Sequence, residues 1–270
     1  MERSVQEENI RPAAGGLFGR TIVVSAVLLS GVIQFIPLMP HPAALSISVM
    51  TVVLFAAAMV LRERTAVSVT LLVSLLAIWR MTVSAFFWPA ILPPLACYFV
   101  LVGSIPTLRK SLTWLRRGSF NRAVLLRMGI TVLLSGAALL AWFLIITPDL
   151  RHFLRSLPSW NPVLLPLEGI GFALLNAAME ESLFRGVLME GLDEALGAAR
   201  ISVILQAVVF GLFHIRGIPG GAIGIVLASA YGLMLGDIRR RSQGIVAPFL
   251  THIAADLVIF CMLAVSGPAR

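Results

Sequence analysis

The stretch TIVVSAVLLSGVIQFIPLMP, residues 21–40, contains no charged side chain and decides the class of fold. A membrane-crossing helix needs roughly 20 mostly apolar residues. Because the stretch is long, lacks an obvious small-residue cleavage site and precedes further apolar runs, we expect a retained first helix rather than a cleaved signal peptide. Working outward, further candidate spans lie at about 42–61, 65–86, 90–106, 128–147, 162–190, 201–215, 218–236 and 245–266.

The composition of the 270-residue chain excludes a soluble domain. Hydrophobic residues make up 59% of the chain and charged residues 13%, and the mean hydropathy is +0.95. Soluble domains average about 45–50% apolar and about 25% charged residues. The sequence therefore predicts an all-α, polytopic transmembrane helical bundle with about eight to nine spans.

The formal charge of +8 comes from basic residues in short clusters between the apolar runs. Such clusters favour loops at an anionic cytoplasmic surface over a nucleic-acid site. We expect no nucleic-acid partner, a cytoplasmic N-terminus, and residence in a lipid bilayer, most simply a bacterial plasma (inner) membrane. Under that orientation the outside loops hold Arg151, Arg155 and Arg216, and the inside loops hold Arg62, Arg64, Arg109, Lys110, Arg116, Arg117, Arg122, Arg200, Arg239, Arg240 and Arg241.

Glycine is concentrated in the second half of the chain, where 13 of the 22 glycines lie between Gly169 and Gly244. Small residues allow helix backbones to approach closely within lipid. We therefore divide the chain into a cytoplasmic N-terminal segment (1–20), peripheral transmembrane helices (21–160) and a tightly packed core (161–270). The two cysteines, Cys97 and Cys261, lie inside apolar runs and indicate neither a disulfide framework nor a metal cluster.

The sequence EESLFR, residues 180–185, places charges at the end of an apolar run. Glu181 and Arg185 are four residues apart, so they share a helix face and can pair across one turn. Glu180 lies about 100° round the helix and has no such partner. A buried carboxylate of this kind suits a general base, although the helix could simply have reached the membrane interface, where charges are tolerated.

Two further groups of polar residues lie in later spans. Phe210 and His214, in FGLFH, share a helix face, although a lone histidine near a helix end is often structural. His252 and Asp256, in HIAAD, are also one turn apart, and could equally be a polar pair joining two helices. Ionisable groups inside a membrane are costly, so their occurrence at similar depth on three helices predicts a polar, water-holding chamber.

The succession E-E-x-x-x-R, F-x-x-x-H and H-x-x-x-(N/D) resembles that of the glutamate-type intramembrane proteases, the family of CAAX prenyl endopeptidases and bacteriocin-processing enzymes (CPBP). The resemblance covers about residues 169–260 and makes 161–270 the catalytic core. It implies that Glu180 and His214 activate a water to attack a peptide carbonyl, and that His252 and position 256 stabilise the oxyanion. Glu181, Arg185 and Phe210 would support the site.

One position departs from the pattern of this family, whose best-studied members have Asn where this chain has Asp256. An ionised carboxylate would repel an oxyanion, whereas an amide can donate a hydrogen bond to it. Asp256 must therefore be protonated or must orient His252, and we favour the second, because a carboxylate that accepts from a ring N–H fixes the tautomer.

Two other functions remain open from the sequence. Zinc could be held by glutamate, histidine and aspartate, but no H-E-x-x-H occurs and the histidines lie on different helices. We therefore expect neither a metal nor a cofactor. A non-catalytic transporter, immunity or scaffold protein would also use intramembrane carboxylates, although the two halves show no repeated pattern of broken helices. The expected partner of the enzyme is a peptide or protein substrate presented at the membrane.

Overall fold

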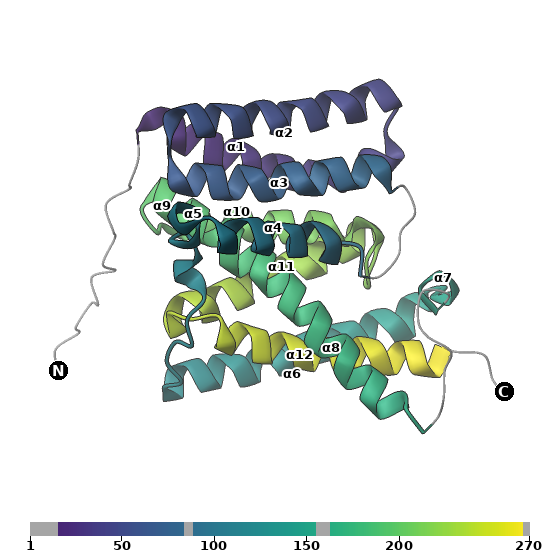
Figure 1. Ribbon diagram of the computed structural model, residues 1–270. Coiled ribbons are helices and arrows are strands. Elements are labelled where there is room, and N and C mark those ends of the chain that lie inside the picture. The colour runs from purple at the N-terminus through teal and green to yellow at the C-terminus, as the bar shows by residue number, and fades with distance from the viewer. Residues whose placement is uncertain (1–15, 84–88, 155–162, 267–270) are drawn as a thin grey trace.

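The computed structural model describes residues 16–83, 89–154 and 163–266, and within these ranges every regular element is helical (Figure 1). The predicted all-α class is confirmed. The long helices run back and forth along one common direction, except that α8 crosses the bundle obliquely (Figure 1). They are α1 (Leu17–Ile33), α2 (His41–Leu61), α3 (Arg64–Thr82), α4 (Leu92–Ser104), α6 (Arg122–Ile146), α8 (Leu165–Glu181), α10 (Arg200–Phe213), α11 (Gly221–Ser242) and α12 (Val246–Ser266).

Each of the nine apolar segments expected from the sequence overlaps one of these helices. Five of them, α2, α3, α6, α11 and α12, are long and apolar enough to cross a membrane, and α1 and α4 are shorter apolar helices. Some bounds differ from the prediction: α1 ends at Ile33, before the prolines at 37 and 40, and α6 begins at Arg122. The side chain of Asn121 explains the early start of α6, because it accepts a hydrogen bond from Val124 N at 3.0 Å and caps the helix.

The segment predicted as one span at 162–190 is more complex. After α8 the chain continues through a π-helical segment, Ser182–Leu188, into α9, Met189–Leu196. Such wider turns are rare and frequently occur at functional sites. Gly186 in this segment packs directly on Trp114, since a Cβ there would lie 2.8 Å from the indole Cδ2. Trp114 ends the short 3₁₀ helix Leu112–Trp114, which follows α5 (Pro106–Arg109).

The basic connections gather at one end of the bundle, at the left of Figure 1. There Arg239 pairs with Glu190 at 3.2 Å and Arg240 pairs with Asp193 at 2.5 Å, so the end of α11 is tied to α9. Arg239 to Arg241 were predicted in a loop, but they form the last turn of α11. The backbone N–H of Ile245 also donates to Arg116 O at 2.9 Å. The basic residues that the sequence analysis assigns to inside loops thus lie at one end of the bundle, and far fewer lie at the other end.

The main core joins both halves of the chain. Buried side chains of α1 and α3 pack in one cluster with Leu183, Phe184 and Phe210. Helix α8 lies against α12, and α10 lies against α11. The α10–α11 approach depends on Gly211, since a Cβ at this position would meet Ile225 O at 2.5 Å. These contacts bring α8, α10, α11 and α12 around one cavity. The short helix α7 (Arg151–Leu154) also contacts α12.

Candidate active site

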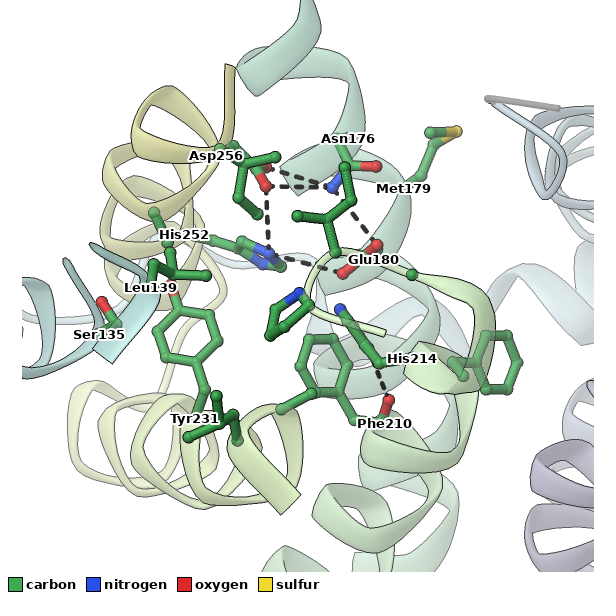
Figure 2. A pocket seen from close by; sticks show the side chains of 18 of the residues that line it. Ser135, Leu139, Asn176, Met179, Glu180, Phe210, His214, Tyr231, His252 and Asp256 are labelled. Atoms are coloured by element: carbon green, nitrogen blue, oxygen red, sulfur yellow. Dashed lines mark hydrogen bonds and ion pairs between the residues drawn. The ribbon is translucent and has the colours of Figure 1, made fainter. Parts of the chain in front are cut away.

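A cavity of about 450 Å³ lies between α6, α8, α11 and α12 and the 3₁₀ turn η4 (His214–Arg216). Most of its wall is apolar, with side chains such as Leu139 and Phe172. Figure 2 shows that polar groups from three parts of the fold converge at one side of it. These polar residues are Asn176, Glu180, His214, His252 and Asp256.

Glu180 on α8 lines the cavity, and only one of its two carboxylate oxygens accepts a hydrogen bond from the described residues. Its Oε1 accepts a hydrogen bond from Asn176 Nδ2 at 3.3 Å. Its Oε2 is buried and accepts no hydrogen bond from the described residues, and lies 3.5 Å from His252 Nε2. A carboxylate oxygen with an unused lone pair, in a cavity large enough for water, can accept a proton.

Glu181 and Arg185 form the ion pair that their spacing predicted, with Arg185 Nη1 2.8 Å from Glu181 Oε1. The side chains are 0% and 1% exposed and do not line the cavity, so the pair lies behind the polar groups. The Arg185 guanidinium also lies 4.4 Å from the centre of the Phe210 ring and donates to Gly232 O at 3.4 Å. Gln206 Nε2 donates to the same carbonyl at 2.9 Å. The Arg185 guanidinium is therefore held in place by Glu181, the Phe210 ring and the Gly232 carbonyl.

The His252 ring is oriented by Glu181. Its Nδ1 lies 2.8 Å from Glu181 Oε1, so the ring donates this N–H to the carboxylate. The sequence predicts Asp256 as the partner of this ring, but Asp256 Oδ1 lies 3.8 Å from the other ring nitrogen, Nε2, beyond hydrogen-bond distance. The helix spacing does bring His252 and Asp256 together, yet the partner of the Nδ1 proton comes from α8. Because Nδ1 is bonded to Glu181, the other ring nitrogen, Nε2, is directed toward Glu180 (Figure 2).

His214 ends α10 and is fixed by the preceding turn. Its Nδ1 lies 2.9 Å from Phe210 O, and because a carbonyl oxygen only accepts, Nδ1 carries the proton. In the neutral ring, Nε2 is then left as an acceptor. The Phe210 ring lies 4.7 Å from the His214 ring in a tilted arrangement and meets Phe184 edge-on at 4.8 Å. The predicted shared face of Phe210 and His214 is therefore present.

Asn176 was not identified as a site residue from the sequence. It lies one turn before Glu180 and also donates to Asp256, 3.2 Å from Oδ1 and 3.3 Å from Oδ2. The available signal was an amide inside an apolar run at the i, i+4 spacing from a carboxylate. Tyr231 was also missed; its ring meets His252 edge-on at 5.5 Å.

The helices before residue 161 contribute to the cavity as well. Gln34, at the end of α1, and Ser135 and Leu139 on α6 belong to its wall. The Gln34 side-chain nitrogen is buried and has no hydrogen-bond partner among the residues that the structure describes. These positions carry no recognisable signature in the sequence, because their contribution depends on how α1 packs on α10 and α6 packs on α12.

The structure thus brings together all seven residues selected from the sequence: Glu180, His214, His252 and Asp256 at the cavity, and Glu181, Arg185 and Phe210 in contact with them or with one another. No group of three or more His, Cys, Asp or Glu side chains within the described residues has the arrangement of a metal site. The catalytic roles of these residues stay predictions.

Comparison with known proteins identifies this part of the chain. The family model described as type II CAAX prenyl endopeptidase Rce1-like matches residues 162–258. No match was found among curated proteins or solved structures. The matched range contains α8, the π-helical segment and α9 to α11, and it extends into α12 past Asp256. Residues 162–258 of this helical membrane protein thus match the CAAX protease family of hydrolases.

Proposed function

We propose that the chain is an intramembrane endopeptidase that hydrolyses a peptide bond near a membrane-presented peptide end with a water activated by Glu180. The observation that carries this proposal is that Glu180, whose Oε2 accepts no hydrogen bond from the described residues, lines one cavity together with the two histidines. The largely apolar wall suits a peptide segment that enters from the bilayer.

The proposed reaction uses the groups as the structure arranges them. Water bound between Glu180 and the acceptor Nε2 of His214 gives a proton to Glu180 as its oxygen bonds to the peptide carbonyl carbon. His252, in its protonated form, donates from Nε2 to the oxyanion while Glu181 accepts from Nδ1. Glu180 then passes the proton to the leaving nitrogen as the C–N bond breaks. No metal or cofactor takes part in this proposal.

The orientation is part of the proposal. The positively charged end of the bundle, where Arg239 and Arg240 lie, faces the cytoplasm, and the N-terminus lies on the same side. α1 begins at this end, close to the connection between α2 and α3, where a Cβ on Gly19 would lie 3.2 Å from Glu63 Cγ. The compartment is most simply a bacterial plasma membrane. Labelling of single cysteines at the two ends of the bundle in intact cells tests the orientation.

The decisive experiment compares the C-terminal peptides of membrane proteins from cells that express the wild type, Glu180→Gln or Glu168→Gln. Glu168 is the matched control, since it lies on the same helix, in its first turn, and outside the cavity wall. We expect shortened C-termini in the wild type and in Glu168→Gln that are absent from Glu180→Gln. Identical peptide sets in all three strains, with a retained cellular phenotype, would instead indicate the non-catalytic membrane protein.

A further inference from the structure

Asn176 occupies a position between two carboxylates that come from different helices. Its Nδ2 lies 3.3 Å from Glu180 Oε1 on α8, and 3.2 Å and 3.3 Å from the two oxygens of Asp256 on α12. Figure 2 shows these contacts as one bridge across the polar side of the cavity. An amide nitrogen carries two N–H donors and a carboxylate carries none, so only the amide can serve both partners.

The charges around this bridge explain why a donor is needed there. Three carboxylates, Glu180, Glu181 and Asp256, surround His252 within 3.8 Å. The buried arginine of the site, Arg185, is bonded to Glu181. Glu180 and Asp256 therefore share the Asn176 amide as their hydrogen-bond donor, while His252 Nε2 lies farther away, 3.5 Å from Glu180 Oε2 and 3.8 Å from Asp256 Oδ1. Like charges this close repel strongly when buried, and a shared donor holds them at a fixed separation.

The bridge also determines which oxygen of Glu180 is available. Asn176 binds Oε1, whereas Oε2 accepts no hydrogen bond from the described residues. With Oε1 tied to α8 and α12, the carboxylate cannot rotate freely about its terminal bond. Oε2 then keeps its lone pairs unused, 3.5 Å from His252 Nε2.

We propose that Asn176 is a positioning residue of the hydrolytic site: its amide holds Glu180 and Asp256 against their repulsion and directs Glu180 Oε2 at the water. This inference rests on the proposed peptidase function. In this proposal Asn176 acts through the two acids to which its amide donates. Asp and Asn have nearly the same shape, so an exchange of Asn176 for Asp removes the N–H donors and leaves the volume of the side chain almost unchanged.

The test exchanges the amide and the acid between the two helices. Three variants are compared with the wild type: Asn176→Asp, Asp256→Asn, and the two together. The substrate is a synthetic peptide that spans a bond found by the Glu180 comparison, cleaved by purified protein in detergent micelles. The single change at 176 places three carboxylates together without the shared donor, whereas the double variant restores one amide and one acid in exchanged positions.

We expect Asn176→Asp to lower kcat by at least 100-fold while KM stays within about threefold. Asp256→Asn should lower kcat by less than tenfold, and the double variant should recover at least tenfold over Asn176→Asp. A role in packing alone predicts that Asn176→Asp is nearly neutral, and that outcome overturns the proposal. A double variant no better than Asn176→Asp overturns it as well.

Asn176→Leu provides a second measurement if the carboxylate at 176 prevents folding. This variant keeps a similar volume but loses both donors, and loss of hydrogen bonds to charged groups predicts a decrease of about 10- to 100-fold in kcat. A kcat equal to the wild type contradicts the proposal. If no peptide depends on Glu180, the peptidase function itself fails; if cleavage depends on Glu180 but not on the donor at 176, this inference alone fails.

Discussion

Substitution of Arg185 by methionine tests how the buried charge is held behind the cavity. The change removes the guanidinium from Glu181, with which it pairs at 2.8 Å, and from the Phe210 ring. Because both ion-pair side chains are at most 1% exposed, the remaining Glu181 charge cannot be solvated. Breaking such a buried pair costs about 3–5 kcal/mol. At about 2–4 °C per kcal/mol for a protein of roughly this size, unfolding should occur about 6–20 °C lower.

The double variant Glu181→Met/Arg185→Met separates stability from activity. It removes the uncompensated charge, so the remaining loss should fall to about 1–3 kcal/mol, the cost of leaving His252 Nδ1 without its acceptor. The double variant should therefore unfold at a higher temperature than Arg185→Met. Peptide cleavage should be lost in the double variant nonetheless, because His252 Nδ1 has lost the carboxylate that orients the ring.

Thermal unfolding of the purified variants in detergent micelles gives the measurement, and Arg127→Met is the matched control. Arg127 pairs with Asp237 at 2.9 Å, but the two side chains are 35% and 46% exposed. An exposed pair contributes only about 0–1 kcal/mol. The reasoning is refuted if Arg185→Met unfolds no earlier than Arg127→Met, or if the double variant is less stable than Arg185→Met.

Three further predictions concern other parts of the site. Gly211→Ala should lower the free energy of unfolding by about 1–3 kcal/mol, because the added methyl meets Ile225 O at 2.5 Å; a wild-type unfolding curve would contradict this close approach. Cleavage should be unaffected by EDTA or phenanthroline, and inhibition that zinc reverses would disprove a metal-independent reaction. Gln34→Met should unfold no earlier than the wild type, because the buried donor has no partner among the described residues. It should also raise KM several-fold if this amide donates to the substrate backbone; an unchanged KM would exclude that contact.

The sequence predicts the helices well because hydropathy reports directly on their length in a membrane. The predicted spans 42–61 and 245–266 agree within one residue with α2, His41–Leu61, and α12, Val246–Ser266. The end of the span predicted at 65–86 and the first residue of the one at 162–190 fall outside the described residues, as do residues 1–15 of the N-terminal segment. The π-helical segment could not be predicted, because hydropathy does not distinguish it from an α-helix and its contact through Gly186 with Trp114 comes from a distant part of the chain.

Within the site, contacts along one helix were predictable and contacts between helices were not. The Glu181–Arg185 pair and the shared face of Phe210 and His214 follow from a spacing of four residues. The partner of His252 depends on the rotation of α8 relative to α12, and hydropathy carries no information on this rotation. Sequence reasoning therefore assigned the orienting role to Asp256, on the same helix, instead of Glu181.

The π-helical segment also constrains the length of the chain between two distant interactions. Successive residues of an α-helix turn by about 100° around its axis, and a π turn accommodates one additional residue. This extra residue sets the rotational phase that lets Glu180 face the cavity while Glu190 faces Arg239 at the basic end. Deletion of one residue from 182–188 would turn one of these faces away from its partner. In this segment the number of residues is therefore constrained as well as the identities of Arg185 and Gly186.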